Sequence, residues 1–256
     1  MVAYAHWSTR RVPVSHPAIA LPSAPVPEPR SHRQHRFSPP LGATEILLVR
    51  HGESEPAVEG QPFDLVDGHG DPALSPDGRE QAVKVCARLA GEGVAAIYVS
   101  KLRRTSETGA PLAGALQLPM TVDPDLHEVY LGDWEGGLFR QKVADGDPIA
   151  VRMIEQERWD VIPNAEPAEA FALRARRAVT RIAAAHPDQR VAAFAHGGII
   201  GQILAQATGS RPFALGATDN ASISHLVVIG DRWILRRFND TAHLEAGLSV
   251  SAAPLT

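Results

Sequence analysis

Three short apolar runs constrain the fold of this chain more than any other feature. They lie within residues 45–50, 94–100 and 190–198, and none of them alternates strictly between apolar and polar side chains. A strand that is apolar on both faces has to be covered on both faces, as in a parallel sheet with helices on each side. The runs therefore predict three buried strands of a mostly parallel sheet.

Helical patterns separate these runs. Ser75-Pro76 predicts an N-cap followed by a proline at the first helical position, and Gly91 and Gly93 predict the end of that helix. A second helix is predicted from about residue 103 to 116. Because strands alternate with helices, the sequence predicts an α/β fold, specifically a three-layer α/β/α sandwich.

The second half of the chain adds helices and a final pair of strands. Two or three helices are predicted within residues 138–186, and the last of them separates an apolar face from a basic one. The apolar face holds Phe171, Ala175, Ala178, Val179 and Ile182, and the other face holds Arg174, Arg177 and Arg181. The segments SISHLVVIG and RWILRRFN predict an antiparallel pair at an edge of the sheet.

Composition separates the ends of the chain from its middle. The first 40 residues hold eight of the 21 prolines, and residues 1–44 carry five arginines against one acid, so their charge of +4 leaves −8 for the rest. We expect a disordered extension over residues 1–43, one domain over 44–245 and a tail over 246–256. The acidic remainder argues against a nucleic-acid binder.

Other bulk features bear on the compartment. Cys86 is the one cysteine, which excludes an internal disulfide and favours a reducing compartment, here the cytoplasm. No apolar run approaches the ~18 residues of a membrane span, so we expect no membrane partner. The N-terminal stretch also lacks the uninterrupted apolar core of a secretory signal. The sequence predicts no particular oligomeric state.

Polar residues of an unusual kind end each of the three buried runs. They are Arg50-His51-Gly52, then Ser100 followed by Arg104, and finally His196-Gly197-Gly198. The carboxyl ends of parallel strands meet at one edge of a sheet, where ligands bind in such folds. Two arginines and two histidines at that edge predict a phosphate site, because a guanidinium fork fits phosphate oxygens and a neutral imidazole can attack phosphorus.

Phosphoryl transfer to or from an alcohol also needs a proton donor for the leaving alkoxide. Residues 126–136, LHEVYLGDWEG, offer Glu128, Asp133 and Glu135 between predicted elements. A carboxyl group beside a dianionic phosphate favours the protonated form that this step requires. The residues alone leave the choice among these three carboxyl groups open.

Metal chemistry has weaker support. The run DGHGD could bind a metal through His69 and Asp71, although turn-forming glycine and aspartate explain it as well. His32 and His35 could bind a metal adventitiously. No Cys/His cluster has zinc spacing and no phosphate-cradling glycine loop is present, so chemistry without a metal is the simpler prediction.

Six segments in order resemble the histidine phosphatase superfamily, also called the phosphoglycerate mutase-like family. They are LVRHGES at 48–54, LSPDGREQA at 74–82, SKLRRTSET at 100–108, LHEVYLGDWEG at 126–136, HGG at 196–198 and NASI at 220–223. Together they span roughly residues 45–240. The resemblance implies a phosphoglycerate mutase-like fold.

The resemblance also implies a role for each matching residue. His51 would be the nucleophile that forms a phosphohistidine, and Glu128 would be the proton donor. Arg50, Arg104 and His196 would hold the phosphoryl oxygens. Family members of this kind use no metal and no nucleotide cofactor.

For some residues the assignment of a role leaves an alternative open. Arg104 is preferred to Arg103 as the family arginine, because it lies four residues after Ser100 in the register of the motif. Glu53, Ser54 and Asn220 are possible substrate contacts, and a structural role is about equally expected for Glu53 and Ser54.

Hydrolysis of a small-molecule phosphate ester is the preferred function, and a phosphoglycerate mutase is the alternative. The mutase pattern resembles R-H-G-[EQ]-[ST]-x-W-N, but Pro56-Ala57 stands where Trp-Asn would be, and residues 138–165 lack the arginine pair of mutases. Many phosphatases carry Trp-Asn as well. A non-catalytic module that binds a phosphorylated ligand is the third reading, which an intact set of five site residues argues against.

Overall fold

A computed structural model of the chain describes residues 31–244. By its internal contacts the chain divides into two units, residues 1–37 and residues 38–256. The described part of the first unit, residues 31–37, is exposed and has no regular secondary structure. The predictions made for residues 1–30 and 246–256 lie outside the described residues.

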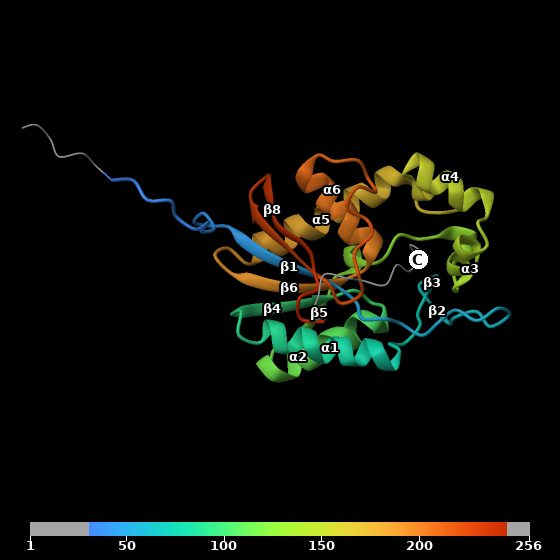
Figure 1. Cartoon of the computed structure of the whole chain (residues 1–256), viewed down its shortest axis with the longest axis horizontal. Helices are drawn as coiled ribbons and strands as arrows, with labels where there is room; N and C mark the ends of the chain where they lie inside the picture. The colour runs from blue at the N-terminus through green and yellow to red at the C-terminus, as the bar shows by residue number, and fades with distance from the viewer. Residues whose placement is uncertain (1–30, 245–256) are drawn as a thin grey trace, which may run out of the picture. The chain divides into compact units, whose positions relative to one another are not determined.

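Six strands of the second unit form one sheet, in the order β5-β4-β6-β1-β7-β8 (Figure 1). The mutually parallel strands are β1 (Thr44–Arg50), β4 (Val94–Val99), β5 (Met120–Val122) and β6 (Arg190–Ala195). The antiparallel strands are β7 (Ile223–Ile229) and β8 (Arg232–Asp240). β1 therefore lies inside the sheet, with a parallel neighbour on one side and an antiparallel neighbour on the other.

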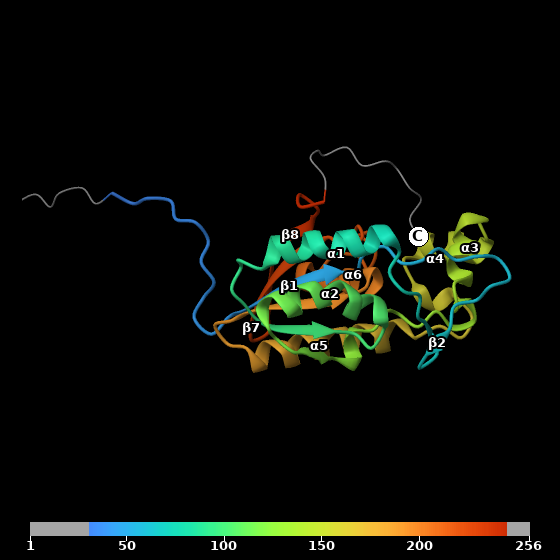
Figure 2. The ribbon, with the colours of Figure 1, turned by 90° about the horizontal axis from the view of Figure 1, so that it is seen from below.

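Two long helices cover each face of this sheet. On one side lie α1 (Pro76–Leu89) and α2 (Arg103–Leu116), and on the other α5 (Ala168–Ala185) and α6 (Gly197–Thr208) (Figures 1 and 2). The hydroxyl of Ser75 accepts a hydrogen bond from the N–H of Gly78 at 3.0 Å, which makes it the N-cap expected for α1. The three-layer α/β/α sandwich with a mostly parallel sheet is confirmed.

The two hydrophobic cores meet at β1. Ile46 and Leu48 pack in the core under α5 and α6, whereas Leu47 and Val49 pack in the core under α1 and α2. Successive side chains of a strand point to opposite faces, so a strand that serves two cores must be apolar throughout. Burying each such side chain stabilises the fold by about 1.5–3 kcal/mol, which fixes where the strand ends.

The final pair of strands is antiparallel and lies at an edge of the sheet, as expected. β8 is the edge strand, and β7 lies between β1 and β8 and is mostly buried. β5, at the opposite edge, was not predicted, because three residues are too short for a periodic pattern to emerge.

A long connecting segment, residues 51–75, joins β1 to α1, and we call it the excursion after β1. It contains a small hairpin of β2 (Leu65–Val66) and β3 (His69–Gly70). Ser54 and Leu74 form an isolated antiparallel bridge that closes the base of the excursion. This segment therefore has fixed ends and a hairpin inside it.

Residues 124–162 form a smaller layer beside the sandwich. It consists of the short 3₁₀ turns η1 (Pro124–Leu126), η2 (Gly132–Trp134) and η3 (Trp159–Val161) and the helices α3 (Leu138–Ala144) and α4 (Pro148–Gln156). A separate hydrophobic cluster holds this layer together, built from Trp134, Ala150, Met153 and Ile162.

The predicted basic face of α5 is wrong at one position. All five apolar residues expected on the core side are buried, and Arg177 and Arg181 lie toward the surface. Arg174, however, is only 9 % exposed. The reason is that the loop after η1 crosses the helix there and offers its carbonyl groups to the Arg174 guanidinium.

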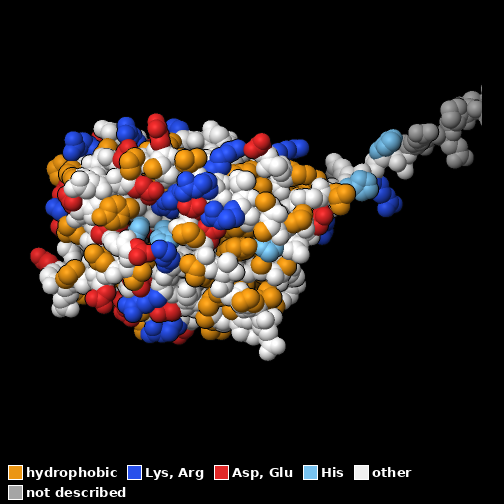
Figure 3. All heavy atoms as spheres, turned by 180° about the vertical axis from the view of Figure 1, so that it is seen from behind, with side chains coloured by type: hydrophobic (Ala, Val, Ile, Leu, Met, Phe, Trp, Pro, Cys, Tyr) orange, Lys and Arg blue, Asp and Glu red, His pale blue; other side chains and the backbone are white. Residues whose placement is uncertain are grey.

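The surface mixes side chains of different types. On the face seen in Figure 3, lysine and arginine side chains are interspersed with acidic and hydrophobic ones, and no continuous basic face is formed there. Of the helices within residues 31–244, none combines the length and apolarity needed to cross a membrane.

Candidate active site

The polar residues predicted to converge come from the carboxyl ends of three parallel strands. Arg50 and His51 end β1, Ser100 follows β4, and His196 follows β6. Since β1, β6 and β4 are neighbours in the sheet, these ends lie side by side. The ring centroids of His51 and His196 are 5.1 Å apart and the rings stand roughly edge to face.

His51 has a defined tautomer. Its Nδ1 lies 2.7 Å from the carbonyl oxygen of Gly52, and because a carbonyl only accepts, Nδ1 carries the proton. Nε2 therefore keeps its lone pair, and the Nε–H of Arg104 donates to it over 3.3 Å. Burial, together with the charges of Arg104 and Arg50, holds the pKa of His51 well below its usual range. The imidazole is thus neutral at neutral pH.

Two arginines flank this imidazole. Arg104 is buried, its Nη1 donates to the carbonyl of Gly70 at 2.9 Å, and burial lowers its pKa to about 10, so it remains charged at neutral pH. Arg50 donates from Nη1 to the carbonyl of Thr218. Burial lowers the pKa of Arg50, while the negative charge of Glu128 raises it.

His196 is held by a hydroxyl. Its Nε2 lies 2.8 Å from the Oγ of Ser100, which in turn accepts the N–H of Leu102 at 3.1 Å. We assign the Ser100 proton to the bond with Nε2, which leaves the imidazole proton on Nδ1. Burial, then the charge of Arg104, holds the pKa of His196 well below its usual range, so this ring is also neutral.

Two buried donors of this cluster lack a partner within the described residues. They are the Nε of Arg50 and the Nδ1 of His196. A buried donor without an acceptor costs about 1–3 kcal/mol, so such groups are retained where a ligand supplies the acceptor. Two unmet N–H groups beside charged guanidinium groups fit the oxygens of a phosphate.

Glu128 reaches this cluster from the loop after η1. Its carboxylate oxygens accept the backbone N–H groups of Gly198 at 3.0 Å and Ile199 at 3.1 Å, at the start of α6. Gly198 leaves no room for a side chain, because a methyl group there would lie 2.4 Å from Oε1 of Glu128. The carboxyl group therefore lies at the start of the helix that His196 precedes.

The other two carboxyl groups of this stretch are engaged elsewhere. Asp133 accepts the side-chain amide of Asn164 at 2.9 Å. Glu135 accepts the backbone N–H groups of Leu131 and Gly70 and so joins the β2–β3 hairpin to η2. The geometry thus favours Glu128 among the three carboxyl groups that the sequence left open.

Several motif residues hold the backbone around His51. Thr108 accepts the N–H of Gly52 at 3.0 Å, and Gln81 accepts the N–H of Glu53 at 2.8 Å. The side-chain amide of Asn220 donates to the carbonyl of His51 at 3.1 Å. Asn220 was predicted as a possible substrate contact, and this bond gives it a role in fixing the backbone of His51.

Ser54 and Arg140 form a pair that the sequence did not reveal. The hydroxyl of Ser54, which is buried, accepts from Nη2 of Arg140 at 2.7 Å, and Nη1 donates to the carbonyl of Glu55 at 2.9 Å. The charge of Arg140 lowers the pKa values of Arg50, His51 and Arg104, which places a third guanidinium near the site. Glu53 is exposed. No motif marks Arg140, so sequence patterns alone offered no signal for it.

The alternative metal site is not assembled in the described residues. Across residues 31–244, no three His, Cys, Asp or Glu side chains converge as a metal site would require. Asp71 accepts the backbone N–H of Arg103 at 2.8 Å, and the ring of His69 stands edge to face with that of His127 at 5.3 Å. His32 and His35 are exposed.

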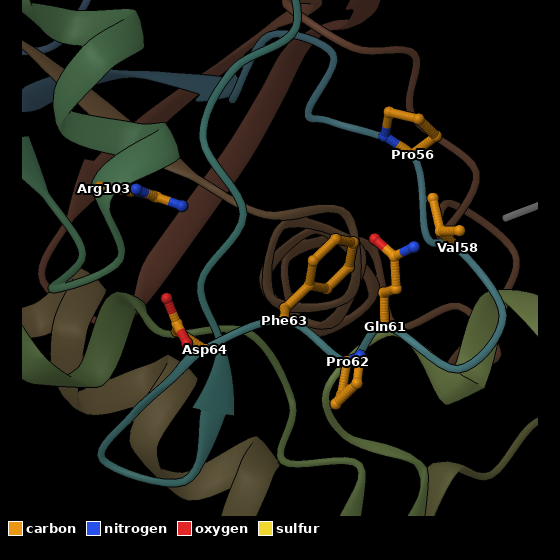
Figure 4. A pocket seen from close by; sticks show the side chains of 7 residues that line it. All are labelled: Pro56, Val58, Gln61, Pro62, Phe63, Asp64 and Arg103. Carbon is orange, nitrogen blue, oxygen red and sulfur yellow. The ribbon is translucent and has the colours of Figure 1, made fainter.

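A cavity of about 280 Å³ opens between residues 56–64 and the start of α2. Figure 4 shows Phe63 and Gln61 on one wall and Arg103 on the other. Phe63 lies under the guanidinium of Arg140, with 5.6 Å from Cζ to the ring centroid, and Arg103 is next to Arg104 in sequence. Two lining residues of the cavity are thus neighbours of site residues, Phe63 by its ring contact with Arg140 and Arg103 by its place beside Arg104 in the chain.

Comparison with known proteins points to one family. Residues 46–241 match the model of the histidine phosphatase superfamily, branch 1. Phosphoglycerate mutase-like protein 4 of Arabidopsis thaliana is 33 % identical over 208 residues, which covers 78 % of this chain and 87 % of that protein. Glucosyl-3-phosphoglycerate phosphatase of Mycobacterium tuberculosis is 31 % identical over 198 residues, with 73 % and 86 % covered.

Solved structures agree with the sequence relatives. The native structure of a mycobacterial glucosyl-3-phosphoglycerate phosphatase superposes with a TM-score of 0.62 and 29 % sequence identity. The match covers 76 % of this chain and 98 % of that one.

Proposed function

The chain belongs to the histidine phosphatase superfamily, and from that membership and the geometry of its site we propose that it hydrolyses small-molecule phosphomonoesters through a phosphohistidine on His51. The observation that carries the proposal is the tautomer of His51. A neutral ring with its proton fixed on Nδ1 and its lone pair on Nε2 beside Arg104 is poised to attack phosphorus.

The first half of the reaction transfers the phosphoryl group to the enzyme. Nε2 of His51 forms a bond to phosphorus while the bond between phosphorus and the ester oxygen breaks. Arg50, Arg104 and the Nδ1–H of His196 stabilise the charge on the phosphoryl oxygens, which is the main way in which such sites accelerate the transfer. The leaving oxygen takes a proton from Glu128 and departs as an alcohol.

The second half returns the enzyme to its starting state. A water oxygen attacks phosphorus, the bond between phosphorus and Nε2 breaks, and Glu128 accepts a proton from the water. Inorganic phosphate then leaves. Glu128 acts as acid first and base second, and its carboxyl group is close enough to interact electrostatically with both Arg50 and Arg104, which supports a place beside the phosphate.

We assign the alcohol part of the ester to the cavity beside Phe63. That cavity is lined by the excursion after β1 and by Arg103, on the side of Ser54 and Arg140. Phe63 offers an apolar surface, and Gln61 and Asp64 offer hydrogen-bonding groups. Arg103 is thereby proposed to face substrate, whereas Arg104 holds phosphate.

Hydrolysis is favoured over the mutase reaction. Residues 138–165 lack the arginine pair that mutases carry. The relative named as a phosphatase also supports hydrolysis. Incubation with 3-phosphoglycerate and a trace of 2,3-bisphosphoglycerate distinguishes hydrolysis from the mutase reaction. We expect phosphate release to be the faster process, and isomerisation faster than phosphate release would show that the protein is a mutase.

The nucleophile is tested by substitution and trapping. We expect the full chain to release phosphate from an aryl phosphate in the presence of a chelator, and His51→Ala to reduce kcat at least ~10³-fold. Quenching a reaction with ³²P-labelled substrate in alkaline denaturant should trap base-stable, acid-labile label on the wild type and none on His51→Ala. Activity that survives in His51→Ala, or label that persists there, would disprove the assignment.

A further inference from the structure

Arg174 makes an unusual number of contacts with one loop. Its Nη1 donates to the carbonyl of His127 at 2.7 Å and of Asp125 at 3.0 Å, and its Nη2 donates to the carbonyl of Glu128 at 2.7 Å. Three backbone carbonyls within four residues are thus gathered by one guanidinium. Its planar fork of five N–H donors is the side chain best able to do this.

A partly buried acid, Glu166, completes the arrangement. Glu166 binds Arg174 in a bidentate manner, with 2.7 Å to Nε and 2.8 Å to Nη2. Glu166 also accepts the N–H of Tyr130 at 3.3 Å, and its own N–H donates to the carbonyl of Tyr130 at 2.9 Å. The two residues therefore hold the segment on both sides of Glu128.

The neighbouring arginines of α5 are bound in a different way. Arg177 and Arg181 donate to the side chains of Asp125 and Asp123, and both guanidinium groups are about half exposed. They touch no carbonyl of residues 127–128 among the described contacts.

We propose that Arg174 is a positioning residue for Glu128, which it acts on through the backbone carbonyls of residues 127 and 128. The Glu128 carboxylate must stand at the start of α6, within reach of the ester oxygen, and its side chain can do so only if its backbone is fixed. Arg174 fixes that backbone through these carbonyl groups. This inference rests on the proposed role of Glu128 as the proton donor.

A positioning role predicts an effect that depends on the leaving group. A poor leaving group, such as the alkoxide of glycerol 3-phosphate, needs the proton from Glu128, whereas a nitrophenolate leaves without it. Arg174→Lys keeps the charge beside Glu166 but loses the fork. We expect it to lower kcat for glycerol 3-phosphate at least tenfold and for 4-nitrophenyl phosphate less than threefold. Arg177→Lys is the matched control and should change neither.

A second set of variants separates this proposal from the one on which it rests. In a Glu128→Gln background, Arg174→Lys should cause no further loss with glycerol 3-phosphate, because the group that it positions is gone. Equal losses on both substrates, or a further loss in that background, would overturn the positioning role. If Glu128→Gln itself affects both substrates equally, the proton-donor assignment fails first and this inference with it.

A second, milder substitution keeps the proposal testable if Arg174→Lys does not fold. If Arg174→Lys does not give folded protein by circular dichroism, Glu166→Gln carries the same test, because it leaves the arginine in place and weakens only its anchor. The same selectivity between the two substrates is expected, at smaller amplitude. Unaltered selectivity in folded Glu166→Gln would then overturn the proposal.

Discussion

Gly52 and Gly78 pack backbone against backbone. A methyl group added to Gly52 would lie 2.5 Å from the carbonyl oxygen of Gly78, and one added to Gly78 would lie 1.9 Å from the carbonyl oxygen of Glu53. The N–H of Ser75 donates to that same Glu53 oxygen at 2.9 Å. The start of α1 is therefore pressed onto the residues that follow His51, and glycine at both positions is required by space.

We predict that Gly78→Ala destabilises the protein by at least ~3 kcal/mol, because backbone on both sides of the contact would have to move. Chemical denaturation measures the effect. Gly114→Ala is the matched control, since Gly114 lies in α2 with nothing within 4 Å of an added methyl group. Alanine is the better helix former, so the control should be stabilised by about 0.5–1 kcal/mol. Similar stabilities for the two variants would contradict the contact.

Ser100→Ala should reduce kcat about 10- to 100-fold, because His196 loses the hydrogen bond that fixes its tautomer and orientation. Steady-state kinetics with an aryl phosphate gives the number. Ser106→Ala, a hydroxyl loss on α2 without a bond to a histidine, should leave kcat within about twofold. An unimpaired Ser100→Ala enzyme would show that the serine does not set the proton position of His196.

His51 should remain neutral well below the pH at which an exposed histidine becomes charged. The pKa of His51 is lowered by burial and by Arg104 and Arg50, so its protonated form is reached only at a pH well under 6.5. Nitrogen NMR of the imidazole rings, with His51→Ala for assignment, should show a neutral ring protonated on Nδ1 at pH 6. A ring that is mostly charged at that pH would contradict the site geometry.

His127 should make the fold less stable in mild acid. Burial lowers its pKa to about 4, against about 6.5 in an unfolded chain, so between those values the unfolded state binds more protons. The free energy of unfolding therefore falls as pH drops from 6.5 toward 4. His127→Gln should remove on the order of 2 kcal/mol of that pH dependence, measured by urea unfolding at pH 7 and pH 4.5. If the free energy of unfolding of His127→Gln falls with pH as much as that of the wild type, His127 is not the group that causes the fall.

The elements that could be predicted from the sequence are those marked by a strong local pattern of residues. β1 could be recognised because its residues serve two cores, and α1 because Ser75 and Pro76 mark its start. The convergence of His51 and His196 followed from the rule that parallel strands align their carboxyl ends.

Other features depend on contacts that no local pattern encodes. Arg174 has the spacing of a surface residue on α5, and its burial is caused by a loop some 46 residues earlier in the chain. Arg140 lies on a seven-residue helix without a motif, and its place beside Ser54 depends on the path of the excursion after β1. The interior position of β7 follows from its pairing with β1, which the order of strands along the chain does not reveal.

The bridge between Ser54 and Leu74 has an evolutionary consequence. It closes residues 55–73 into a unit with fixed ends, while Gln81 and Ser75 hold Glu53 just outside it. Insertions or replacements inside that unit can reshape the cavity around Phe63 without moving His51. If the proposed function holds, one interchangeable segment would be enough to redirect the reaction toward a new substrate, and we expect descendants of this chain to diverge there first.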